Sequence, residues 1–346
     1  MQPIEGKQRI DVLDYLRGFA LLGIILVNIP ALMRVGLLET TIDIAYNRFL
    51  LLFVEGKFFS IFSFLFGVGF YLFISRAKAR GERAYLLFTR RLAILLSMGI
   101  IHFFFQPGEA LSVYAIYGFI ALPFYKVRKE ITLVIALLLL AVTAYYGIKI
   151  AMPLPLILLG LAAGKYRIFE KLKELRKQLV ILTILMLCFS VAGLFYQWSY
   201  VPAGNVQFEQ LTDNELKQHI TNVQQFNLIG LQVSPFVSAF YVGALLLLLQ
   251  YPVIQTILSP LKAYGRMALT NYLGQTVLIL LVGRTFDLIG NIQLIQTLWI
   301  CLAIYCVQLL FSKAWLHYCR FGPMEWLWRM GTYLSVPPLF NKREKI

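Results

Sequence analysis

Long apolar runs recur from one end of the sequence to the other, and they restrict the possible folds more than any other feature. A helix of about 20 mostly apolar residues crosses the hydrocarbon core of a bilayer. Hydrophobic residues make up 59% of the 346 residues and charged residues only 14%, which excludes a soluble enzyme and a soluble domain with a single anchor. We therefore predict an all-α membrane protein, a single domain over residues 1–346 that forms a bundle of about ten transmembrane helices. The predicted crossings are 12–33, 49–74, 92–105, 111–125, 131–150, 153–164, 178–198, 228–250, 264–283 and 291–312.

The distribution of basic residues predicts the orientation of these helices. Most of the 32 Lys and Arg residues lie in alternate connections, as in the run 165–177, and such basic connections face the cytoplasm. Both termini are therefore expected in the cytoplasm, with an extracytoplasmic loop over 199–227 and a cytoplasmic tail over 313–346 that contains an amphipathic segment. The same rule splits the stretch 131–164 in two, because a single crossing there would place 165–177 outside. Whether 153–164 crosses the bilayer fully is left open.

Charge and cysteine content limit the expected partners. The net charge of +15 follows from the basic connections, so membrane lipid is an expected partner and nucleic acid is not. The four cysteines form no CxxC pair, so we expect neither a metal site nor a disulfide framework. The predicted location is the bacterial plasma (inner) membrane, and a homo-oligomer is left open.

The first predicted helix carries polar residues that are costly inside a membrane. Asp14 and Arg17 are three residues apart, so they share one face and can pair. Asn28 follows Arg17 by eleven residues, about 20° out of register around the helix axis, so one polar stripe runs along the helix. Charged residues at membrane depth favour a functional role. The alternatives are a topology anchor for the charged pair and a simple interhelical hydrogen bond for Asn28.

A second stripe lies on the third predicted helix, where Arg91 and His102 have the same spacing. His102 is either a hydrogen-bonded contact between helices or a group that handles protons. Glu109 follows a Pro-Gly turn, from which a carboxylate could orient or charge-stabilise the imidazole, although spacing alone favours a solvated turn residue. His102, Glu109 and Asn28 are the candidate catalytic residues.

Other polar residues are candidates for binding a substrate or cosubstrate. Arg90 and Arg91 form a cluster suited to phosphate groups, or they only fix topology and touch anionic lipid. Asn271 and Gln275 are four apart on one face, where they can line a cavity or join helices. The full set of predicted binding residues is Asp14, Arg17, Lys57, Arg90, Arg91, Asn271 and Gln275.

Five ordered motifs carry a resemblance to a known family. They are RIDVLDYLRGFALLGIILVNI, GKFFSIFSFLFGVGF, RRLAILLSMGIIH followed by GEALSVYAIYGF, GRMALTNYLGQT and RFGPMEWLWRM. Together they resemble the YeiB-like family of bacterial membrane proteins, domain of unknown function 418, over nearly the whole chain. The resemblance implies a polytopic membrane fold and leaves the activity undefined.

The first motif also resembles transmembrane acyltransferases, namely the acyltransferase-3 group and the heparan glucosaminide N-acetyltransferases. Those enzymes move an acyl group from cytoplasmic acyl-CoA to an acceptor across the membrane. In the acyltransferase-3 pattern an Arg-Gly pair is followed by a functional histidine at the position of Asn28, so this chain departs from the pattern there. His102 is the intramembrane histidine that can substitute.

The resemblance implies transfer of an acyl group, acetyl among the candidates, from acyl-CoA to an envelope glycan or a small-molecule acceptor. His102 would act as the base, and no cofactor would be bound permanently. The same polar stripes would also serve a transporter or exporter of a small organic solute. In a third reading they only specify helix packing in a non-catalytic membrane protein, so the sequence leaves open whether the chain is an enzyme.

Overall fold

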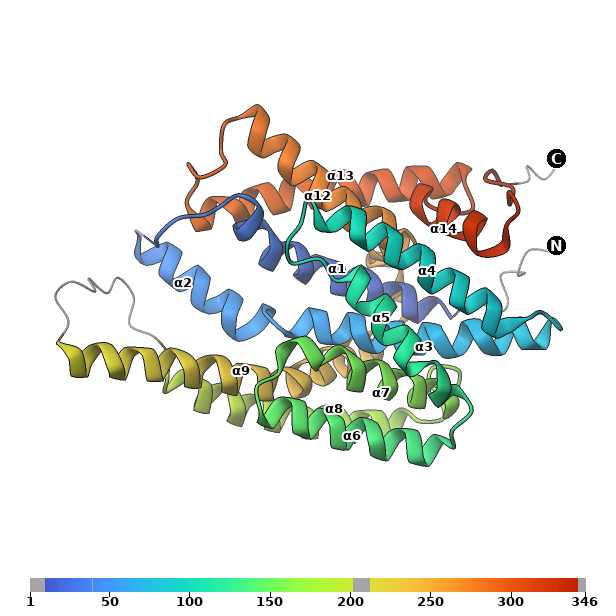
Figure 1. Cartoon of the computed structure of the whole chain (residues 1–346), viewed down its shortest axis with the longest axis horizontal. Helices are drawn as coiled ribbons and strands as arrows, with labels where there is room; N and C mark the ends of the chain where they lie inside the picture. Colours follow the sequence, from blue (N-terminus) through green and yellow to red (C-terminus); the bar gives the residue numbers. More distant parts are fainter. Residues whose placement is uncertain (1–9, 39, 202–211, 342–346) are drawn as a thin grey trace.

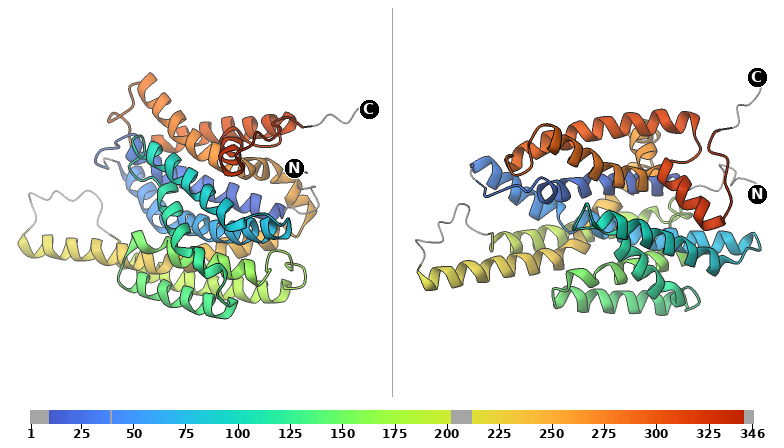
Figure 2. Two further views of the ribbon diagram at one scale, coloured as in Figure 1. Left: turned by 45° about the vertical axis from the view of Figure 1, so that its right-hand side comes forward. Right: turned by 45° about the horizontal axis from the view of Figure 1, so that its top comes forward.

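The computed structural model describes residues 10–38, 40–201 and 212–341, and within these ranges the chain is helical and contains no β-strand. The long helices lie side by side in an elongated bundle (Figure 1 and Figure 2). This confirms the predicted all-α class. The elements are α1 (Asp11–Leu32), α2 (Thr41–Phe49), η2 (Leu50–Val54), α3 (Lys57–Ala79), α4 (Ala84–Phe103), α5 (Leu111–Ala121), η3 (Leu122–Tyr125), α6 (Lys129–Tyr145), η4 (Lys149–Ala151), α7 (Pro153–Lys165), α8 (Arg176–Trp198), α9 (Asp213–Leu248), α10 (Pro252–Ile257), α11 (Ser259–Arg266), α12 (Ala268–Thr285), α13 (Leu294–Tyr318) and α14 (Pro323–Tyr333).

Six helical stretches of the described residues are long and apolar enough to cross a membrane. They are α1, the stretch Thr41–Ala79, α4, α8, α9 and α13. The chain is thus a multi-pass membrane protein. A helix also lies over each of the other predicted ranges, but the count of ten crossings and the cytoplasmic position of the termini remain predictions.

The second predicted crossing, 49–74, is not one continuous helix. The π-helical segment η2 ends at Val54, and α3 begins only after Gly56, whose φ is 77°. A Cβ at Gly56 would lie 2.6 Å from the hydroxyl oxygen of Ser234 on α9. Close packing against α9 therefore requires glycine at the break, and the apolar run alone gave no sign of this contact.

The predicted outer loop and the tail are partly helical. In the segment 199–227, residues 202–211 lie outside the described residues, and α9 begins at Asp213, where Thr212 and Glu215 form a capping box. The tail is described as far as residue 341: α13 continues to Tyr318 and α14 follows. The helix over the predicted crossing 291–312 therefore ends at Tyr318, later than expected.

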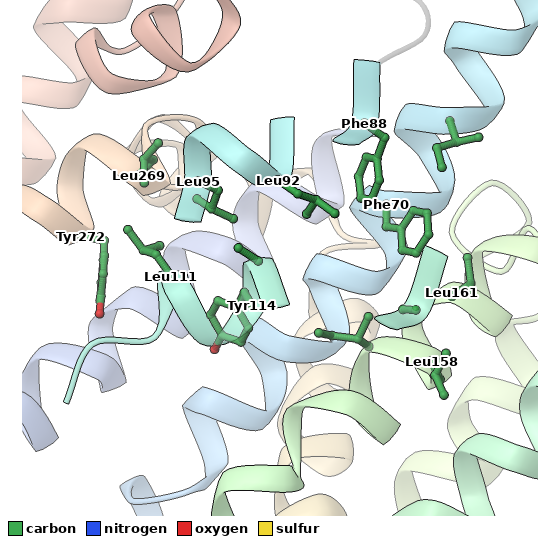
Figure 3. Packing of buried hydrophobic residues seen from close by; sticks show 14 of the residues in the cluster. Phe70, Phe88, Leu92, Leu95, Leu111, Tyr114, Leu158, Leu161, Leu269 and Tyr272 are labelled. Atoms are coloured by element: carbon green, nitrogen blue, oxygen red, sulfur yellow. The ribbon is translucent and has the colours of Figure 1, made fainter. Parts of the chain in front are cut away.

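The main buried cluster lies where α3, α4, α5, α7 and α12 meet (Figure 3). Helices α3 and α7 approach very closely there: a Cβ at Gly67 would lie 2.0 Å from the carbonyl oxygen of Ile157, and one at Gly160 would lie 2.0 Å from that of Phe64. Small residues allow such contacts between membrane helices. This packing holds α3 against the neighbours that form the candidate site.

Candidate functional site

His102 lies in the last turn of α4 and is 6% exposed. Its Nε2 is 2.9 Å from the hydroxyl oxygen of Thr276 on α12. Its ring meets the ring of Tyr272 edge to face, with 5.1 Å between centroids. Because Tyr272 and Thr276 are four residues apart, they share one face of α12. The predicted intramembrane histidine therefore lies at the contact between α4 and α12.

Glu109, in the connection between α4 and α5, approaches the other side of the same imidazole. Its Oε1 is 3.8 Å from Nδ1 of His102. The carboxylate also accepts hydrogen bonds from the backbone N–H groups of Leu111 and Ser112, so it caps α5. Glu109 is therefore buried, whereas its spacing favoured a solvated turn. Burial raises the pKa of Glu109, but the imidazole and the donors at the start of α5 outweigh burial and keep the pKa below its ordinary value.

Glu109, His102 and Thr276 form a chain of polar side chains that can handle a proton. A carboxylate beside Nδ1 favours the tautomer that carries its proton there, which leaves Nε2 to accept the hydrogen bond from Thr276. An imidazole held in this way can take a proton from a hydroxyl group. The structure thus brings together two predicted catalytic residues. Thr276 and Tyr272 were missed, although both belong to the GRMALTNYLGQT motif.

Asn28, the third predicted catalytic residue, is half-buried and lines a cavity of about 70 Å³. Ala110 of the α4–α5 connection and the side chains of Tyr114 and Tyr272 are also in its wall. Figure 3 shows the two tyrosine rings on either side of Leu111, with their hydroxyl oxygens pointing to the same side. Neither His102 nor Thr276 is part of the wall, and the ring contact between His102 and Tyr272 links the histidine to the cavity.

Asn271 and Gln275 are buried on α12, and their amides join helices. Asn271 donates hydrogen bonds to the carbonyl oxygen of Tyr264 and the hydroxyl of Ser312, both at 2.9 Å. Gln275 donates to the Tyr264 hydroxyl at 2.6 Å, and that hydroxyl donates to Gln308 at 3.0 Å. This network connects α11, α12 and α13, and neither predicted residue lines the cavity.

The predicted charged residues of α1 and α4 lie at the other end of these helices. Arg17 donates a hydrogen bond to the Asp14 carboxylate at 3.0 Å, so the expected pair is present. The Arg91 guanidinium stacks on Trp328 of α14, 3.4 Å from the ring centroid. The Trp328 Nε1 donates to the Arg91 carbonyl oxygen at 2.8 Å. Arg90 is half-buried. Because α14 packs over Arg91, the two arginines do not form one open phosphate site.

Two more charged residues lie at helix starts. The ammonium of Lys57, which is 1% exposed, donates to the Leu51 carbonyl oxygen at 3.0 Å and so bridges the break between η2 and α3. Glu325 of α14 accepts hydrogen bonds from the backbone N–H groups of Leu269 and Thr270, at 2.7 and 3.1 Å, and so caps α12. Burial raises the pKa of Glu325 in spite of these bonds. The RFGPMEWLWRM motif contains this residue, but the sequence gave no sign of its contact with α12.

Comparison with known proteins places the chain in a family. Residues 163–335 match the family described as "Protein of unknown function (DUF418)". The sequence is 54% identical to an uncharacterized 39.9 kDa protein in the amylase 3' region of Bacillus acidopullulyticus, over 99% of both chains. It is 29% identical to the uncharacterized protein YxaH of Bacillus subtilis (strain 168), over 99% of this chain and 98% of YxaH. It is 25% identical to the uncharacterized protein YeiB of Escherichia coli (strain K12), over 98% of this chain and 100% of YeiB.

The chain therefore belongs to the DUF418 family, which confirms the resemblance drawn from its five motifs. No solved structure matches it. The matched range contains Tyr272 and Thr276, whereas Asn28, His102 and Glu109 precede it. The relatives, in contrast, align over almost the whole chain.

Proposed function

We propose that the chain transfers an acyl group from cytoplasmic acyl-CoA to an acceptor on the other side of the membrane, either an envelope glycan or a small molecule. The observation that carries this proposal is the buried chain of Glu109, His102 and Thr276 beside the cavity. An imidazole with a hydroxyl in hydrogen-bond distance of one ring nitrogen and a carboxylate near the other has the parts of a general-base site. Ionisable residues at membrane depth are usually functional.

In this proposal His102 is the general base. The acceptor hydroxyl or amine gives its proton to the Thr276 oxygen, while Thr276 gives its own proton to Nε2 of His102. A bond forms between the acceptor and the acyl carbonyl carbon, and the carbon–sulfur bond of the thioester breaks. The imidazolium, stabilised by Glu109, then protonates the leaving thiolate. Asn28 donates a hydrogen bond to the carbonyl oxygen, on which negative charge develops.

The spacing along α4 suits an extended donor. Arg91 and His102 are eleven residues apart, about 16 Å along the helix axis, so phosphates bound at the basic end would lie one pantetheine arm away from the cavity. The side chain of Arg17 is 30% exposed and lies within electrostatic range of Arg91. In the proposal Arg17 contacts the phosphates, and Arg91 adds its charge from beneath Trp328.

The experiment compares the full-length protein with His102→Gln and with His317→Gln, an exposed histidine that serves as the matched control. Purified protein in detergent receives radiolabelled acetyl-CoA and an envelope extract as acceptor. Release of the CoA thiol and transfer of label are both measured. Loss of a general base slows transfer by about a hundredfold or more, so His102→Gln should lose this activity while His317→Gln keeps it.

Three outcomes would contradict the proposal. Full transfer by a folded His102→Gln protein would remove the general base. Absence of any transfer by the wild type, together with flux of a small solute through proteoliposomes without acyl-CoA, would favour a transporter. Absence of both activities would favour a non-catalytic role for the polar side chains.

A further inference from the structure

Two lysines share the ring of one tyrosine where α3 ends and α4 begins, at the right-hand end of the bundle in Figure 1. The ammonium nitrogen of Lys78, in the last turn of α3, lies 4.9 Å from the centroid of the Tyr85 ring. The ammonium nitrogen of Lys126, which follows η3, lies 5.4 Å from the same centroid. Lys78 is also 4.5 Å from the centroid of Tyr125, the last residue of η3. Cation–π attraction favours these positions, so the contacts hold two positive charges around one ring.

The two charges lack an acidic partner among the described residues. Both lysines are exposed, and neither forms an ion pair with a carboxylate in this part of the chain. The acidic residues closest to them in sequence, Glu82 and Glu130, pair with other basic residues. Two ammonium groups around one ring repel each other. An anion bound between them would replace this repulsion by attraction to both.

The Tyr85 hydroxyl supplies a third polar group. It accepts a hydrogen bond from the Lys78 ammonium at 3.3 Å. A phenol oxygen that accepts in this way still has its own proton to donate, and a phosphate oxygen is a strong acceptor for that proton. The ring is half-buried and meets the Tyr125 ring edge to face, with 6.0 Å between centroids. The two cations and this hydroxyl therefore form a set of groups that suits one phosphate.

Apolar side chains exposed on the neighbouring helices determine which phosphate compound fits. Leu86, next to Tyr85 on α4, is 41% exposed, and Ile120, near the end of α5, is 47% exposed. Because the chain is a multi-pass membrane protein, such side chains contact the acyl chains of lipids. Lysine and tyrosine side chains at the end of a membrane helix lie at the level of the headgroups. A phosphate attached to acyl chains can therefore contact both surfaces, whereas free phosphate contacts only the polar groups.

We propose that Lys78, Lys126 and the hydroxyl of Tyr85 bind the headgroup phosphate of an anionic phospholipid, whose acyl chains lie along α4 and α5. This site does not depend on the proposed acyl transfer. Two ammonium groups attract a headgroup whose only charge is the phosphate and repel one that also carries a cation, so an anionic lipid binds better than a zwitterionic lipid. Lys171 and Lys173 are also exposed, but within the described chain they stack on no aromatic ring. They form a matched control pair.

The experiment measures lipid binding to the delipidated full-length protein in detergent by native mass spectrometry. The probes are dioleoyl phosphatidylglycerol, which is anionic, and dioleoyl phosphatidylcholine, which is zwitterionic and has the same acyl chains. Each lysine beside an anionic headgroup strengthens binding by about fivefold. The wild type should therefore prefer phosphatidylglycerol by about tenfold or more. The double variant Lys78→Gln/Lys126→Gln should lose this preference, and Lys171→Gln/Lys173→Gln should keep it.

Three results would overturn this inference. Equal binding of the two lipids by the wild type would remove the preference for an anionic headgroup. The same loss of affinity in both double variants would show that the total charge, rather than this cluster, attracts the lipid. Displacement of phosphatidylglycerol by millimolar inorganic phosphate would show that the site takes a free anion.

Discussion

Glu109 has two separable roles in this account, and its substitution distinguishes them. The carboxylate accepts hydrogen bonds from the backbone N–H groups of Leu111 and Ser112 and also faces His102. Each buried N–H group left without a partner costs about 1–3 kcal/mol. Glu109→Ala removes both acceptors, so the free energy of unfolding should fall by about 2–6 kcal/mol. Glu109→Gln keeps one acceptor oxygen and should lose about half as much.

The assay follows unfolding in mixed micelles of rising dodecyl sulfate content by tryptophan fluorescence. Glu130→Ala is the control, because Glu130 is half exposed and its neighbours Arg128 and Lys129 are exposed as well. Exposed ion pairs contribute at most about 1 kcal/mol. Equal stabilities for Glu109→Ala and Glu130→Ala would refute the capping role of Glu109. In acyl transfer, Glu109→Gln should be slower than the wild type even where it is fully folded, because its neutral amide does not stabilise the imidazolium.

Three further predictions concern stability in the same micelle assay. The pKa of Glu109 is lowered in the folded protein, so the ionised carboxylate contributes fully to the free energy of unfolding above the unfolded pKa of about 4.3, and this contribution is lost as pH falls through the lower folded pKa. If the wild type were no more stable than Glu109→Gln already at neutral pH, this prediction would be contradicted. A Cβ at Gly67 would lie 2.0 Å from a carbonyl oxygen, whereas the nearest atom to a Cβ at Gly69 is 3.5 Å away. Gly67→Ala should therefore lower the free energy of unfolding by about 1–3 kcal/mol, and Gly69→Ala by much less. Equal effects of the two substitutions would show that α3 and α7 are not in close contact. Glu325→Ala should cost about 0.5–2 kcal/mol by removing the cap of α12, and unchanged stability would mean that α14 does not hold that helix end.

The apolar runs predicted where helices lie, because hydrophobicity along the chain is a local property. The same is true of the pairing of Asp14 with Arg17, which are three residues apart on one helix. The break at Gly56 could not be predicted, since it depends on packing against Ser234, far away in sequence.

The candidate site shows the same limit. Helix periodicity placed Arg91 and His102 on one stripe of α4, but it could not show that Thr276 would be the partner of His102. Nor could it show that Trp328 would cover Arg91. Both contacts join segments that are far apart in the chain. Glu109 illustrates the opposite error: a Pro-Gly turn suggested solvent, yet the carboxylate is buried because it caps α5.

Sealed proteoliposomes give the most direct test of transfer across the membrane. Radiolabelled acetyl-CoA is supplied on the side of the basic connections, and envelope extract is enclosed on the other. The account predicts labelled acetyl product on the acceptor side, free CoA retained on the donor side, and neither with His102→Gln. Intact label that crosses without forming a product, or a product that forms equally well with His102→Gln, would contradict it.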